Sequence, residues 1–161
     1  IQMFKENPLF GVGYSYFNAY SSDQKAAHNT YVHILAELGI VGYVPFILLL
    51  YMTMIHLHRA VNLKSLIPKR EYAYLTGLFA ALSGYLTAVY FLSRQYNHVL
   101  YAMLGLSLCQ VIIICRDDEL YQRVFGPARR DLRYGVLFAL GSVALLYLSI
   151  RIGSALGGGQ P

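Results

Sequence analysis

A histidine–asparagine pair stands at the start of the first long apolar stretch of the sequence. His28 and Asn29 come directly before residues whose pattern predicts a helix. The first turn of a helix has unpaired N–H groups and a partial positive charge, which favour an anionic ligand and a neutral imidazole. A neutral imidazole is a suitable general base near neutral pH. The alternative is structural: His28 or Asn29 only caps the helix.

Three charged side chains are further candidates to contact a substrate. Arg94 lies in a short turn between two apolar segments, where its guanidinium could clamp a pyrophosphate or carboxylate, or anchor among lipid headgroups. Lys25, just before His28, is a further candidate substrate-binding residue. Glu37 follows His33 by four positions, so the two side chains share a helix face. Glu37 then either lines a polar cavity or forms a local hydrogen bond with His33.

The sequence predicts neither a metal site nor a cofactor. His56 and His58 have the spacing of a ligand pair, but no third ligand lies near them. The acidic run 117–119 is expected to be solvated and to balance nearby arginines. The net charge of +5 does not indicate nucleic-acid binding, because the basic residues lie in short segments between apolar runs.

Apolar helices must position these residues. Hydrophobic residues make up 57% of the 161 positions and charged residues only 13%, a composition typical of membrane proteins. We expect an all-α fold, a polytopic transmembrane helical bundle of about four spanning helices plus an outer loop. Because the chain begins at Ile1, it is interpreted as a C-terminal fragment of a longer protein. The predicted spans are about 34–57, 73–92, 99–115 and 134–152.

Gly39, Gly42 and Pro45 interrupt the first predicted span. One interpretation is a single kinked helix. The other is a short helix over about 28–38, a break at Gly39 and a spanning helix after it. The second is favoured because it places Glu37 near the outer interface, where a charge is less costly than in hydrocarbon.

Four glycines are predicted to have structural roles. Gly11 and Gly13 are turn signals in the N-terminal loop. Gly39 and Gly42 are three apart on one helix face, where small residues let another helix approach closely.

The distribution of basic residues predicts the orientation in the membrane, since cytoplasmic loops carry an excess of Lys and Arg. Nine basic residues lie in the segments after the first and third spans, and four lie elsewhere. The His28 loop is therefore predicted to face outward. The resulting division is an outer loop with the catalytic motif (1–33), three spanning helices (34–115), a cytoplasmic basic loop (116–133), and a further helix with a tail (134–161).

Three sequence elements together resemble the O-antigen ligase and Wzy-type polymerase family. They are the loop Asn7–Gly13, the pair His28–Asn29 and the segment Gly39–Gly42. The family signature is His, then Asn, Ser or Gln, then nine residues, then Gly-x-x-Gly, and Thr30–Leu38 supplies those nine residues. The resemblance covers about Asn7–Leu50 firmly. A further span at 134–152 departs from the family pattern.

The resemblance implies a glycosyl transfer on the periplasmic face of the bacterial inner membrane, without metal or nucleotide. The donor would be a glycan on undecaprenyl pyrophosphate, and the acceptor lipid A–core or another lipid-linked glycan. His28 corresponds to the family's general base. Asn29, Lys25, Arg94 and Glu37 are the candidate substrate-binding residues, and the last three have no motif match.

Two other classes of protein remain open at the level of sequence. A transporter segment would carry intramembrane charges, and Glu37 is the single candidate in the predicted spans. A non-catalytic membrane scaffold would tolerate substitutions in the loop but not at Gly39 or Gly42. The choice between ligase and polymerase also stays open.

Overall fold

The chain folds into α-helices that pack around one long central helix. The computed structural model describes residues 4, 6–13, 16, 29–91 and 97–156. Within these ranges there is no strand, so the expected all-α fold is confirmed. The main elements are α3 (Thr30–Asn62), the 3₁₀ helix η1 (Lys64–Leu66), α4 (Lys69–Ala88), α5 (His98–Ile114), α6 (Asp118–Phe125) and α7 (Ala128–Leu156).

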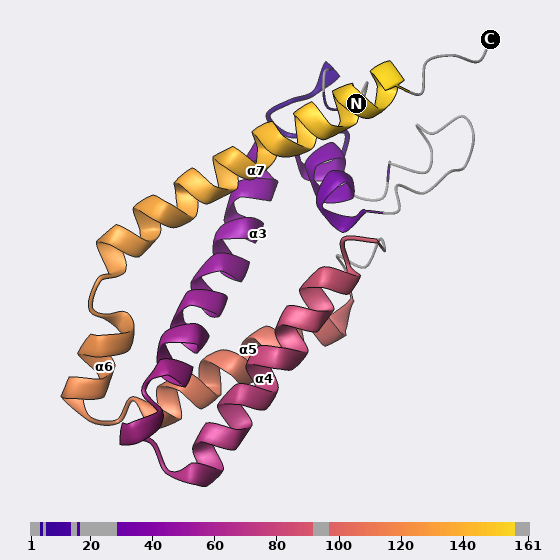
Figure 1. Ribbon diagram of the computed structural model, residues 1–161. Helices are drawn as coiled ribbons and strands as arrows, with labels where there is room; N and C mark the ends of the chain where they lie inside the picture. The colour runs from indigo at the N-terminus through magenta and orange to yellow at the C-terminus, as the bar shows by residue number, and fades with distance from the viewer. Residues whose placement is uncertain (1–3, 5, 14–15, 17–28, 92–96, 157–161) are drawn as a thin grey trace.

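The central helix is α3, which contacts α4, α5, α6 and α7 (Figure 1). α4 and α5 run beside each other as a hairpin, and α7 passes along another side of α3. The core consists of aliphatic side chains from several helices, among them Ile34 and Leu57 of α3, Leu82 of α4 and Leu104 of α5. The residues around Asn29 are therefore placed by the end of α3 and by the elements that pack against it.

The surface of α5 and α7 is rich in exposed apolar side chains. Leu106 and Ile112 on α5, and Leu137 and Leu148 on α7, are each more than half exposed. Contiguous apolar surface of this kind is unfavourable in water and favourable against lipid tails. The chain is accordingly a helical membrane protein.

Two helical stretches of the described chain are long and apolar enough to cross a membrane. They are Thr30–Asn62 and Asp118–Ser149. α5 is apolar but has 17 residues, and α4 begins with three charged residues, Lys69 to Glu71. The expectation of about four spans therefore stays a prediction.

The helices extend beyond the predicted apolar segments at several ends. α4 and α7 each start directly after a proline, Pro68 and Pro127, a residue compatible with helix starts. Both then include charged turns that the apolar pattern could not mark. The segment 116–133, expected as a loop, contains the short helix α6.

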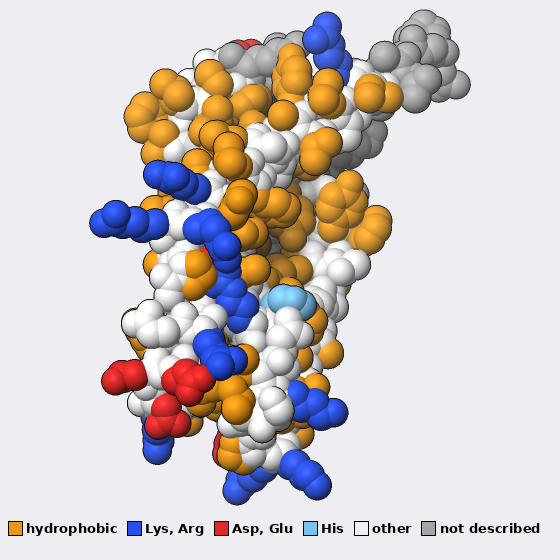
Figure 2. Space-filling view, turned by 60° about the vertical axis from the view of Figure 1, so that its left-hand side comes forward, with side chains coloured by type: hydrophobic (Ala, Val, Ile, Leu, Met, Phe, Trp, Pro, Cys, Tyr) orange, Lys and Arg blue, Asp and Glu red, His pale blue; other side chains and the backbone are white. Residues whose placement is uncertain are grey.

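A partly buried ion pair joins the far end of α3 to α7. The Arg59 guanidinium donates two hydrogen bonds to the Asp131 carboxylate, at 2.5 and 2.6 Å, and a third to the Val124 carbonyl at 3.0 Å. Asp131 is 2% exposed, so this bidentate pair fixes the turn between α6 and α7 against α3. Exposed arginines gather over α6 and the first turns of α7 (Figure 2).

Candidate active site

A break in α3 is the main structural feature near the candidate site. Gly39 has φ 62° and ψ −165°, so the helical backbone stops at Leu38 and restarts at Ile40. This confirms the predicted short helix, break at Gly39 and second helix. A helix end leaves carbonyl groups unpaired before it and N–H groups unpaired after it, and these need partners.

The loop at residues 7–13 supplies those partners. The carbonyls of Pro8 and Leu9 accept hydrogen bonds from the N–H groups of Ile40 and Val41, at 3.0 and 3.1 Å. On the other side of the break, the N–H groups of Val12 and Gly13 donate to the carbonyls of Ala36 and Glu37, at 3.0 and 2.9 Å. The loop thus takes the place of the missing helical turn, and Figure 1 shows it beside the start of α3.

Two glycines make this close approach possible. Gly11 has φ 70° and Gly39 has φ 62°, a left-handed region that other residues rarely adopt. A Cβ at Gly11 would overlap the Glu37 carbonyl, and a Cβ at Gly39 would overlap the Leu9 carbonyl. Loop and break are therefore one interlocked unit, and we call residues 7–13 together with 36–41 the loop–break unit.

The other two predicted structural glycines have different surroundings. Gly13 has φ 101°, and a Cβ there would meet the Tyr16 ring at 3.7 Å, an ordinary contact, so the backbone conformation alone calls for glycine. A Cβ at Gly42 would collide with the Leu38 side chain across the break. The close neighbours of Gly39 and Gly42 are thus a loop carbonyl and Leu38, instead of a neighbouring helix as expected.

Asn29 caps α3. Its side-chain Oδ1 accepts hydrogen bonds from the N–H groups of Tyr31 at 2.9 Å and Val32 at 3.2 Å. For Asn29, the geometry therefore shows the structural role that the sequence offered as an alternative, that of a helix cap. A cap at Asn29 is compatible with a functional His28, because the cap fixes the backbone that directly follows His28 in the chain.

Replacing the cap gives the first testable prediction. Asn29→Ala is expected to lower stability by about 1 kcal/mol, since two N–H groups lose their acceptor. Asn29→Ser should retain most of that stability, because serine also accepts from the first turn. Thermal unfolding of the detergent-solubilised protein measures both variants, and equal losses for alanine and serine would contradict a capping role.

The end of α4 holds the capped start of α3. The Thr30 N–H donates to the Val89 carbonyl and the Tyr31 hydroxyl to the Leu86 carbonyl, each at 3.2 Å. The rings of Tyr31 and Tyr90 lie 6.3 Å apart. The end of α4 therefore lies next to Asn29, and the Tyr31 contacts are a feature that sequence reasoning missed.

Glu37 forms a local pair with His33. Glu37 Oε1 lies 3.1 Å from His33 Nε2, and the Glu37 residue is 1% exposed. The carboxylate is enclosed by protein, and the Glu37 carbonyl binds Gly13 of the loop. This close pairing within one helix corresponds to the local alternative, and substrate binding by Glu37 stays a prediction.

Three of the predicted site residues lie outside the described residues: His28, Lys25 and Arg94. Their roles remain predictions from the sequence. Asn97, at the other side of the same turn, is described: its Oδ1 accepts from the Val99 N–H at 3.0 Å and caps α5.

The fold and site together define a helical membrane protein whose longest apolar helix is broken near one end and braced there by a loop. At this end, a capped helix start meets the α4–α5 hairpin. Residues 1–47 match the model of a family described as O-antigen ligase. The match includes the loop–break unit and the pair His28–Asn29. No match was found among curated proteins or among solved structures.

Proposed function

We propose that this protein is a membrane glycosyltransferase of the O-antigen ligase type. It transfers a glycan from undecaprenyl pyrophosphate to a lipid or glycan acceptor at the periplasmic face of the bacterial inner membrane. The observation that carries the proposal is the loop–break unit, in which both glycine elements of the matching segment interlock through four backbone hydrogen bonds. This unit fixes the end of the short helix that begins after the cap Asn29 and stops at Leu38.

In the proposed reaction, His28 acts as general base. It accepts the proton of the acceptor hydroxyl while that oxygen attacks the anomeric carbon of the donor glycan. The bond from the anomeric carbon to the pyrophosphate oxygen breaks, and the glycosidic bond forms. Undecaprenyl pyrophosphate leaves with the bonding electrons, and Lys25 and Arg94 are the candidate cations that stabilise its charge.

The structural surroundings of Asn29 support this assignment in one further respect. A helix start disfavours an added positive charge, so a histidine there is biased toward its neutral, proton-accepting form. The cap and the contacts with Leu86 and Val89 hold this start against the hairpin that leads to Arg94. Donor and acceptor would meet between the loop and the hairpin.

Transfer by the full-length protein in proteoliposomes tests the proposal. With an undecaprenyl-pyrophosphate-linked glycan as donor, we expect product on lipid A–core if the protein is a ligase, and lengthened lipid-linked glycan if it is a polymerase. Donor consumed with neither product would contradict glycosyl transfer. The same vesicles report uptake of a soluble glycan, which a transporter would show and this proposal does not predict.

A further inference from the structure

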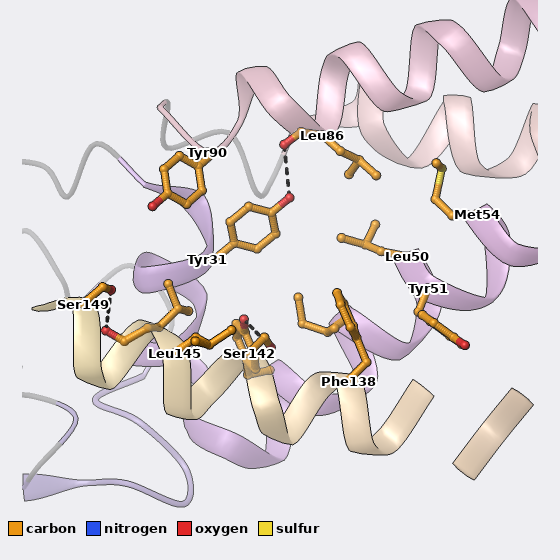
Figure 3. Close-up of a pocket in the computed structure, with 13 residues that line it drawn as sticks. Tyr31, Leu50, Tyr51, Met54, Leu86, Tyr90, Phe138, Ser142, Leu145 and Ser149 are labelled. Atoms are coloured by element: carbon orange, nitrogen blue, oxygen red, sulfur yellow. Dashed lines mark hydrogen bonds between the residues drawn. The ribbon is translucent and has the colours of Figure 1, made fainter. Parts of the chain in front are cut away.

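Helix α7 has two faces with different surroundings. Its inner face is turned toward α3: the hydroxyls of Ser142 and Tyr43 lie 3.0 Å apart, and Phe138 and Ser142 line a cavity of about 550 Å³ beside α3 (Figure 3). Asp131 belongs to the same inner face, since it is 2% exposed and bonds to Arg59 of α3. A helix turns by about 100° per residue, so positions two before and two after Asp131 point to the opposite, outer face.

Three arginines of α7 lie on or beside this outer face, in the first turns of the helix. Arg129, Arg130 and Arg133 are all exposed. Asp131 stands between them in the chain, but its carboxylate is turned inward and forms its ion pair with Arg59. No other acidic side chain of the described residues forms an ion pair with any of the three. The outer face therefore presents three positive charges between positions 129 and 133.

Two of these arginines stand close to each other. Arg129 and Arg133 are four positions apart, so their side chains are neighbours on one helix face, where like charges repel. A bound anion would relieve this repulsion, and a phosphate can accept hydrogen bonds from two guanidinium groups at once. The nearby Arg123 of α6 differs, since its guanidinium already donates to Glu119 at 2.7 Å. The start of α7 is therefore suited to a phosphate group.

Apolar side chains continue the outer face directly beyond the arginines. Leu137 and Leu140 are 64% and 48% exposed, and they follow Arg133 by four and seven positions, a spacing that keeps them on its helix face. With a rise of about 1.5 Å per residue, they lie about 6 and about 10 Å along the helix from Arg133. In Figure 2, basic side chains gather over α6 and the first turns of α7, and apolar side chains cover the surface farther along. The order matches a molecule with a phosphate at one end and hydrocarbon attached to it.

We propose that this outer face of α7 binds an anionic phospholipid of the surrounding membrane. Arg129 and Arg133 hold the phosphate, and the acyl chains lie along Leu137 and Leu140. Arg130 adds a third positive charge, which favours a headgroup with a net negative charge over one that carries an amine. The site is on the side of the membrane that holds the excess of basic residues, away from Asn29, so the inference does not depend on the proposed function.

A binding titration with the full-length protein in nonionic detergent tests this inference. The probe is phosphatidylglycerol with a fluorescent acyl chain, and the competitor is phosphatidylcholine with the same acyl chains. We expect phosphatidylcholine to compete about tenfold more weakly than unlabelled phosphatidylglycerol, the effect of roughly one basic contact at a membrane surface. Equal competition by the two lipids would overturn the inference, since headgroup charge would then play no part. Equal competition by glycerol 1-phosphate would also overturn it, because the site would then bind a soluble anion.

Two double variants with the same loss of charge locate the site. Arg129→Gln with Arg133→Gln is expected to weaken phosphatidylglycerol binding by about 30-fold, the effect of losing two basic contacts. Its thermal unfolding should stay close to wild type, because both side chains are exposed. The control, Arg70→Gln with Arg123→Gln, removes two arginines that already have partners and should leave binding unchanged. An equal loss in the two double variants would mean that net charge attracts the lipid, and the site on α7 would be excluded.

Discussion

Exchange of His28 for alanine is expected to lower glycan transfer by about 10²–10⁴-fold, the usual contribution of a positioned general base. The acceptor hydroxyl would have to lose its proton to water at the moment it attacks the donor. Protein level and stability should stay close to wild type, because the hydrogen bonds of the cap come from Asn29, not from His28. Glycan display on cells that carry the full-length variant measures the effect, with protein level followed in the same membranes.

His58→Ala is the matched control for this substitution. His58 lies on α3 near its other end, is exposed, and bonds within the helix to Asn62 at 3.0 Å. Its removal should leave transfer unchanged. Normal glycan display by the His28 variant at normal protein level would exclude the general-base role and favour a scaffold, even if the loop–break unit is intact.

The break in α3 and the cap at its start could be predicted from the types and spacing of nearby side chains. The break in α3 was predicted because Gly39, Gly42 and Pro45 interrupt the apolar run and a break at Gly39 places the charge of Glu37 near the outer interface. A helix cap at Asn29 was predicted as the alternative to a functional role, since an asparagine side chain readily accepts hydrogen bonds from the N–H groups of the first helical turn. Both features are local, so a few neighbouring residues are enough to show them.

The contacts of the break could not be predicted in the same way. The bonds from Pro8 and Leu9 to Ile40 and Val41 join backbone groups about thirty residues apart, and backbone groups are the same in every residue. A signal was nevertheless present in Gly11 and Gly39, since turn glycines mark positions where backbone can approach closely. The sequence assigned Gly39 and Gly42 to helix–helix packing because that is the commoner use of small residues in membranes.

Long-range side-chain contacts were also beyond sequence reasoning. The pair of Arg59 and Asp131 joins α3 to α7 across 72 positions, and each residue alone resembles an ordinary charge near a helix end. The same holds for Tyr31, whose hydroxyl reaches Leu86 of α4. The Tyr31 contact places the described end of the site, while the roles of His28, Lys25 and Arg94 still depend on the sequence.

Replacing Gly39 by alanine is expected to have the largest effect on stability. A non-glycine residue at φ 62° and ψ −165°, a backbone region populated essentially by glycine, costs about 1–3 kcal/mol, and the overlap of the new Cβ with the Leu9 carbonyl adds a further cost of about 1–3 kcal/mol. Relief of the overlap requires the loop to move away, which removes the partners of Ile40 and Val41. Thermal unfolding of the solubilised protein should show the loss, and glycan display should fall with it.

Two other glycines give the comparison that makes this result specific. A Cβ at Gly77 of α4 meets nothing within 4 Å, so Gly77→Ala should be neutral or slightly stabilising. A Cβ at Gly42 would overlap the Leu38 Cβ, which side-chain rotation cannot move, but Gly42 lacks the positive φ of Gly39, so Gly42→Ala should have an intermediate effect. The expected order of destabilisation is therefore Gly39, then Gly42, then Gly77. An unfolding temperature of Gly39→Ala equal to that of Gly77→Ala would mean that the loop does not brace the break, and the structural basis for placing His28 at this end of α3 would be lost.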